Sequence, residues 1–151
     1  MTAKDYLQEI QKMDMFIEQK IYEYDTLKKE TGGLRAVDYS KVHILSRSTS
    51  AGFTISSDQK LDIELELKRD IQHFNTLRHE RILEIQRMER SVYTELLFKR
   101  YVEYKTLACI AAEMKKEPKY TSKLHMDALK AFEYQYAEKL ERENPLLKRA
   151  S

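Results

Sequence analysis

The amino-acid sequence predicts an all-α protein with a long, coiled-coil-like N-terminal helical hairpin and a C-terminal helix-turn-helix module. Only 3 Gly and 2 Pro interrupt its 151 residues, which favours long helices over strands joined by many turns. Charged residues make up 34% of the chain and hydrophobic residues 42%, a mixture typical of exposed amphipathic helices. This length suits one ordinary domain or two small helical ones.

A first long helix is expected from about Thr2 to Glu30. Apolar residues recur there at three- and four-residue intervals and line one face: Ile10, Met13, Ile17, Ile21 and Tyr24. Thr2 is a candidate N-cap, and the pair Gly32-Gly33 is a strong stop signal. One narrow apolar face does not stabilise an isolated helix, so this helix requires a partner.

That partner is a second long helix, expected to begin at Ser57 or Asp58 and to run to about Glu89. The Ser/Thr/Gly-rich segment between the helices, at about 34–57, is expected to form a long loop, with or without a helical turn at 38–45. Burial of both apolar faces predicts an antiparallel hairpin over residues 1–90. A parallel homodimer is the alternative, because the pattern resembles that of a coiled coil.

Residues 91–144 are expected to form the helix-turn-helix module, and residues 145–151 a loose tail. A helix over Val92–Val102 leads into the motif, either after a break near Glu89–Ser91 or, because no Gly or Pro stands there, as a continuation of the second long helix. Thr106 is a candidate N-cap for the first motif helix, and Pro118 suits the first position of the second. The last helix is expected to end at Asn144, before Pro145. The inward-facing residues of the two helices are Leu107, Ile110, Ala111, Met114, Thr121, Leu124, Ala128 and Phe132.

The outward positions near the start of the second motif helix are polar or basic. In a helix-turn-helix these positions contact base edges and phosphates in the major groove. Groove contacts are expected from Lys119, Ser122 and Lys123. Phosphate contacts are expected from Lys105, Lys115 and Lys116, whereas His125 has either a phosphate contact or an ordinary surface or packing role. The full predicted DNA-binding set is Lys105, Lys115, Lys116, Lys119, Tyr120, Ser122, Lys123 and His125.

Charge is distributed unevenly along the chain, which supports an anionic partner for the C-terminal half. The net charge is only +2. The window from Leu96 to Lys130 nevertheless holds eight basic and four acidic residues, a local charge of +4, and the remainder therefore sums to −2. Such asymmetry is an electrostatic sign of nucleic-acid binding, although a solvated helix surface can have the same composition.

The segments RYVEYKTLACIAAEM and SKLHMDAL, together with the opening MTAKDYLQEIQKMDMFIEQKIYE, resemble small phage-encoded transcription regulators of the ArpU/RinA type. The C-terminal half of that family looks like region four of bacterial sigma factors. The resemblance implies a phage or prophage regulator of late genes that binds double-stranded DNA. It also implies RNA polymerase as a partner. A homodimer is expected because one small module provides little affinity for DNA.

Three positions of the motif depart from its usual pattern. Lys115 stands where Gly usually opens the turn, Lys116 where an apolar residue follows, and Thr121 where Val or Ile faces inward. A buried Thr hydroxyl requires an acceptor, most easily the backbone carbonyl one turn earlier. These departures leave an alternative function open, namely a helical protein-interaction adaptor whose helix-turn-helix no longer reads DNA.

Other classes of protein are poorly supported by the sequence. The four histidines, His43, His73, His79 and His125, show no metal-ligand spacing with one another or with Cys109. Gly-rich phosphate loops and nucleophile motifs are absent, so no enzyme activity and no cofactor are expected. The single Cys suits a reducing compartment, and no stretch approaches the ~20 apolar residues of a membrane span. A cytoplasmic protein is expected.

Overall fold

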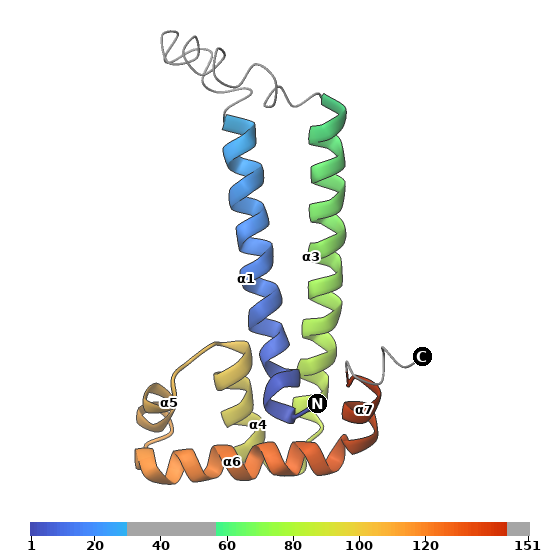
Figure 1. The fold of residues 1–151 in the computed structure, drawn as a ribbon. Coiled ribbons are helices and arrows are strands. Elements are labelled where there is room, and N and C mark those ends of the chain that lie inside the picture. The colour runs from blue at the N-terminus through green and yellow to red at the C-terminus, as the bar shows by residue number, and fades with distance from the viewer. Residues whose placement is uncertain (30–56, 145–151) are drawn as a thin grey trace. The chain divides into compact units, whose positions relative to one another are not determined.

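The computed structural model describes residues 1–29 and 57–144, and this part of the chain is entirely helical, without strands. Its elements are α1 (Ala3–Lys28), α3 (Ser57–Gln86), α4 (Ser91–Leu97), the π-helical turn η3 (Phe98–Val102), α5 (Leu107–Glu113), α6 (Pro118–Gln135) and α7 (Ala137–Arg142) (Figure 1). The all-α prediction is confirmed. The loop predicted at 34–57 and the tail at 145–151 lie outside the described residues, except Ser57, which begins α3.

The chain divides into two compact units, of which the first joins Met1–Met13 to Phe74–Ser151 and the second is Asp14–His73. The sequence suggested a different division, near residue 90. The first turns of α1 belong to the same core as α6: Tyr6, Leu7 and Ile10 are fully buried, and the Tyr6 ring lies 6.0 Å from that of Phe132. Burial of these side chains makes the beginning of the chain part of the C-terminal unit.

Helix α1 begins with a side-chain cap, as its sequence predicts. The backbone N–H of Asp5 donates to Oγ1 of Thr2 at 3.1 Å, and that hydroxyl donates to the Asp5 carboxylate at 2.8 Å. An acidic residue in the first turn also suits the positive end of the helix dipole. The start of the first helix is therefore encoded locally.

In the second unit, the contacts between α1 and α3 are partly polar. Lys20 pairs with Glu66 at 3.1 Å and with Asp70, and the Tyr24 hydroxyl donates to Glu64. Ile17 is buried here, at 6% exposure. Ile21, expected on the same apolar face, is exposed. Other large apolar side chains in this unit also remain exposed: Met15, Phe16, Tyr22, Leu61 and Leu65.

The break predicted near Glu89–Ser91 is present, because α3 ends at Gln86 and α4 begins at Ser91. The helix predicted over Val92–Val102, in contrast, changes type partway. After Leu97 it continues as the π-helical turn η3, in which Glu103 N donates to Phe98 O at 3.1 Å. Tyr101 and Val102 are buried on this turn. The spacing of apolar residues in a sequence does not distinguish such a turn from an α-helix.

The last predicted helix is also divided. We expected it to continue to Asn144, but α6 ends at Gln135, and Tyr136 adopts φ −114° and ψ 26° before α7. The Tyr136 hydroxyl donates to the Glu84 backbone carbonyl at 2.7 Å, and its ring lies 4.7 Å from that of Phe132. These contacts with α3 and α6 explain why the chain turns here without Gly or Pro. Figure 1 shows α5 at the beginning of α6 and α7 at its end.

Candidate nucleic-acid interface

Helix α5 has the N-terminus that its sequence predicts. Thr106 is its N-cap, with extended backbone, and its Oγ1 accepts a hydrogen bond from Cys109 N at 3.2 Å. The cap satisfies one of the free N–H groups at the start of this short helix. Pro118 stands at the beginning of α6, where its missing N–H has no cost.

The turn between α5 and α6 has the hydrogen bonds of a Schellman motif. Lys116 N donates to Ala111 O at 2.9 Å and Lys115 N donates to Ala112 O at 3.3 Å, the two bonds that define this helix ending. Lys115 has φ 55°, the left-handed conformation that Gly adopts without strain. The turn therefore forms with Lys at the position where helix-turn-helix motifs usually have Gly.

Six of the eight residues predicted to face inward on α5 and α6 are buried, while Leu107 and Met114 are half-buried. Ile110, Ala111, Leu124, Ala128 and Phe132 each have at most 5% of their surface exposed. Thr121 is fully buried, and its hydroxyl donates to Glu117 O, one turn earlier, at 3.0 Å. The backbone acceptor expected for this hydroxyl is thus present, and the departure from Val or Ile leaves no unsatisfied group.

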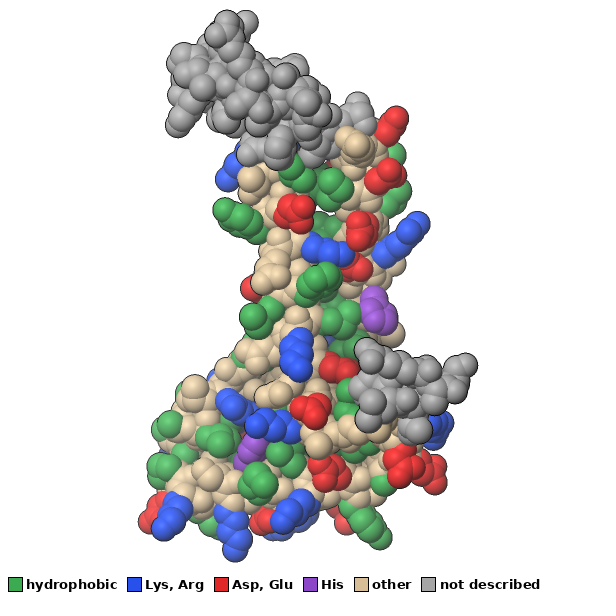
Figure 2. Space-filling view, in the orientation of Figure 1, with side chains coloured by type: hydrophobic (Ala, Val, Ile, Leu, Met, Phe, Trp, Pro, Cys, Tyr) green, Lys and Arg blue, Asp and Glu red, His purple; other side chains and the backbone are tan. Residues whose placement is uncertain are grey.

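The outward face of α6 carries most of the predicted site. Lys119, Tyr120, Ser122 and Lys123 are exposed, as is Lys115 on the turn. Lys116 is half-buried and its ammonium lies 5.1 Å from the centre of the Tyr120 ring. Within residues 1–29 and 57–144, none of these four lysines has an ion-pair partner. Figure 2 shows Lys and Arg side chains, interspersed with Asp and Glu, along the edge of this unit where α6 lies.

Lys105, also predicted to contact phosphate, has acidic partners instead. Its ammonium lies 2.7 Å from a carboxylate oxygen of Glu103 and 2.7 Å from one of Glu113. Glu113 also binds Lys99 at 2.8 Å. The Glu103 and Glu113 carboxylates raise the pKa of Lys105, and Lys105 and then Lys99 lower the pKa of Glu113. Lys105 and Glu113 therefore remain charged at neutral pH. With Lys99 and Glu103 they form a group of two lysines and two carboxylates, whose formal charges sum to zero.

His125 does not belong to the outward face. It is 7% exposed, and its Nε2 lies 2.8 Å from the Tyr101 hydroxyl. Burial, with smaller contributions from Arg100 and Lys4, lowers the pKa of His125 to about 4. The phosphate contact suggested for His125 is therefore incompatible with its position, since the ring is neutral and enclosed. His125 lies four residues after Thr121 and seven before Phe132, which places it on the inward face of α6. This spacing is a signal that the sequence already contains.

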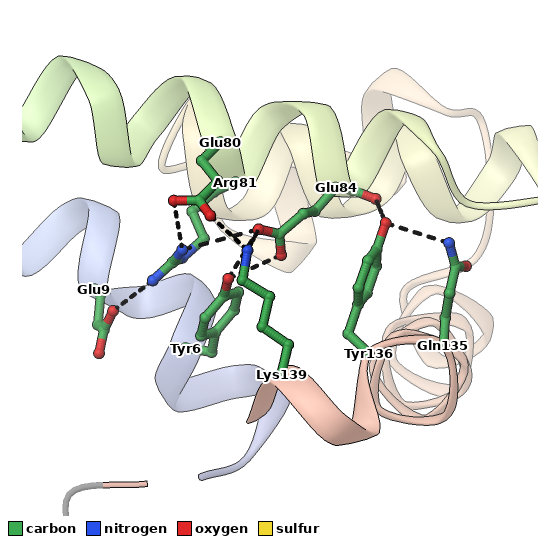
Figure 3. A network of polar contacts seen from close by, with 8 residues as sticks. All are labelled: Tyr6, Glu9, Glu80, Arg81, Glu84, Gln135, Tyr136 and Lys139. Atoms are coloured by element: carbon green, nitrogen blue, oxygen red, sulfur yellow. Dashed lines mark hydrogen bonds and ion pairs between the residues drawn. The ribbon is translucent and has the colours of Figure 1, made fainter. Parts of the chain in front are cut away.

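A second polar cluster, which sequence reasoning missed, holds the first unit together (Figure 3). The Tyr6 hydroxyl donates to Glu84, Arg81 binds Glu9 at 2.9 Å, and Lys139 reaches Glu84 at 2.5 Å. The Arg81 guanidinium also lies 3.5 Å from the centre of the Tyr6 ring. These contacts join α1, α3 and α7, and so help to position α6, which Tyr136 links to α3.

A metal site and a membrane-spanning helix are both absent from the described part of the chain. This part contains no group of three or more His, Cys, Asp or Glu side chains arranged to hold a metal ion. None of its helices combines the length and apolar character that a membrane span requires. No protein-family model, curated protein or solved structure matches the chain. The basic face of α6 is therefore the strongest candidate for a functional surface.

Proposed function

We propose that this protein is a DNA-binding transcription regulator, in which α5 and α6 act as a helix-turn-helix and α6 enters the major groove. The observation that carries the proposal is the group of four lysines without ion-pair partners in the described chain, Lys115, Lys116, Lys119 and Lys123, on the turn and first turns of α6. Phosphate neutralisation by such side chains supplies much of the affinity of DNA-binding proteins. The resemblance to phage late-gene regulators supports the same function.

Residue roles follow from position and exposure. Lys119, Ser122 and Lys123 are assigned to the groove, because they lie on the exposed face of the first two turns of α6. Lys115 and Lys116, on the turn, are assigned to phosphates. Tyr120 supports Lys116 through the contact between its ring and the ammonium. Lys105 and His125 are left out of this set, because one is ion-paired and the other buried.

The direct test is a binding titration with duplex DNA of mixed sequence at low salt. The wild-type chain is expected to bind, and log Kobs is expected to fall with log salt concentration by ~0.9 for each phosphate contacted. The double variant Lys115→Ala/Lys116→Ala removes the two lysines assigned to phosphates and should reduce that slope by about two contacts. Lys12→Ala/Lys68→Ala is the matched control, because it removes two exposed lysines outside the α5–α6 region. Equal binding by both variants would contradict the assignment.

A second candidate function, a helical protein-interaction adaptor, is favoured by the exposed apolar side chains of the second unit. Met15, Phe16, Tyr22 and Leu61 are each more than half exposed, and exposed apolar surface often marks protein contacts. The two functions are compatible if this surface forms a homodimer, which would present two α6 helices to successive half-sites. RNA polymerase is a further partner implied by the resemblance. Sedimentation of the full chain tests the homodimer, and a monomer at micromolar concentration would contradict it.

A further inference from the structure

Glu113 is the centre of an ion-pair cluster beside the α5–α6 pair. One of its carboxylate oxygens lies 2.8 Å from Lys99 Nζ and the other lies 2.7 Å from Lys105 Nζ. Lys99 comes from η3, Lys105 from the segment before α5, and Glu113 from the last residue of α5. The carboxylate of Glu113 thus pairs with both lysines that shortly precede the first motif helix.

These two lysines differ from the lysines of the α6 face in their availability to a polyanion. Lys115, Lys119 and Lys123 are exposed, and the described chain provides no carboxylate that pairs with them. Lys99 and Lys105 retain only 20% and 30% of their side-chain exposure and are held by carboxylates. A phosphate could bind them only by displacing Glu113, and also Glu103 in the case of Lys105.

In a docked helix-turn-helix the first helix crosses the DNA backbone while the second lies in the groove. Cations next to the first helix would then lie near phosphates. We propose that Glu113 restricts the number of DNA phosphates this module contacts, because it holds Lys99 and Lys105 in ion pairs that compete with phosphate. This inference rests on the proposed function and concerns its regulation. Glu113 acts through the two lysines and is a positioning residue.

Restriction of this kind would favour specificity over affinity. Each additional phosphate contact strengthens binding to every DNA sequence equally and carries no sequence information. By neutralising two lysines, Glu113 would lower non-specific affinity while leaving the side chains of α6 free to read bases. A merely structural role, in which the ion pairs only join η3 to α5, predicts no change in the salt dependence of binding when Glu113 is replaced.

The test compares Glu113→Gln with wild type in titrations with mixed-sequence duplex DNA over a series of salt concentrations. Glutamine keeps the size and hydrogen-bonding capacity of the side chain but releases Lys99, and partly Lys105. The slope of log Kobs against log salt should become steeper by about one to two, at ~0.9 per phosphate, with binding about tenfold tighter at low salt. Glu138→Gln is the matched control, since it removes one carboxylate from α7, at the other end of α6, and should leave the slope unchanged (Figure 1).

A second pair of variants assigns the effect to the lysines. Lys99→Ala/Lys105→Ala should leave the wild-type slope unchanged, because both lysines are already neutralised there. In the Glu113→Gln background the same two substitutions should abolish the increase. Circular dichroism melting of each variant checks that its helices are retained.

The outcomes separate the two proposals. If wild type binds duplex DNA and Glu113→Gln has an unchanged slope, the role of Glu113 is overturned and the proposed function stands. If wild type does not bind duplex DNA even at low salt, both are overturned. If Lys99→Ala/Lys105→Ala weakens wild-type binding with a shallower slope, these lysines already contact phosphate and the restriction by Glu113 is contradicted.

Discussion

The hydroxyl of Tyr6 lies 2.9 Å from both carboxylate oxygens of Glu84, although 78 positions separate the two residues. Glu84 is only 4% exposed, and a carboxylate removed from water depends on such partners. Burial raises the pKa of the Tyr6 hydroxyl far above its usual value, Arg81 opposes this, and the hydrogen bond to Glu84 adds to it. The hydroxyl therefore remains a donor at any physiological pH.

Replacement of Glu84 with alanine is expected to lower the free energy of unfolding by about 3–5 kcal/mol, because it leaves buried partners without their counter-charge. Tyr6→Phe removes one charge-assisted hydrogen bond and should cost about 1–2 kcal/mol. Urea denaturation followed by circular dichroism measures both losses. Glu89→Ala removes an exposed carboxylate from the turn after α3 and serves as the control. A loss for Glu84→Ala no larger than the control loss would show that the cluster does not stabilise the fold.

The buried His125 predicts a pH-dependent stability. The pKa of His125 is about 4 in the folded chain against an ordinary value of 6.5. Between these values the unfolded state binds more protons, so stability falls as the pH falls. The contribution of the neutral His125 ring to the free energy of unfolding is complete above pH 6.5. It is lost as the pH falls towards 4, and the loss reaches up to about 3 kcal/mol.

The measurement is a series of urea midpoints between pH 7 and pH 4.5 for wild type and His125→Gln. Glutamine does not titrate in this range and can accept the hydrogen bond from Tyr101, whose own pKa burial raises to about 12. The difference in stability between the two proteins should shrink as the pH is lowered. A pH-independent difference would mean that His125 is protonated as readily in the folded chain as in the unfolded one.

Lys115 in the Schellman turn should be a site of stabilising substitution. Its φ of 55° is accessible to Gly without strain, so Lys115→Gly is expected to gain about 1 kcal/mol in the free energy of unfolding. Lys115→Ala removes the same charge but keeps a Cβ, and should show no comparable gain. Thermal melting of the two variants distinguishes relief of strain from loss of charge, and equal melting temperatures would argue against strain at this position.

The cap of α5 is open to a similar comparison. Thr106→Ala removes the acceptor for Cys109 N and should cost about 1 kcal/mol. Thr106→Ser keeps the hydroxyl and should restore most of the stability. Chemical denaturation provides the values, and an alanine variant as stable as the serine variant would show that solvent replaces the cap without loss.

Local features of this fold could be predicted from the sequence because a few neighbouring residues determine them. The caps at Thr2 and Thr106, Pro118 at the start of α6, and the bond from Thr121 to Glu117 each involve residues within four positions of one another. The exposed face of α6 followed from helical periodicity for the same reason. These features place the predicted lysines on one surface.

Features that depend on distant residues could not be predicted in this way. The end of α6 is determined by the bond of Tyr136 to Glu84, and the charge balance of Lys105 by Glu113, which lies on the next helix. Neither pairing leaves a pattern in the local sequence. The hairpin and the helix-turn-helix remain predictions as named arrangements, although the caps at Thr2 and Thr106 and the turn at Lys115 are present.

The position of residues 1–13 in the first unit has a consequence for how the protein is made. The Tyr6 ring packs beside that of Phe132, so residues that are synthesised well before α6 complete one core with it. Residues 14–73 form a separate unit between these two parts, and closure of so long an intervening segment has an entropic cost. The apolar side chains of the first turns of α1 therefore remain uncovered until α6 has been synthesised. A fragment that starts near residue 90 would lack them and would leave the ring of Phe132 partly uncovered.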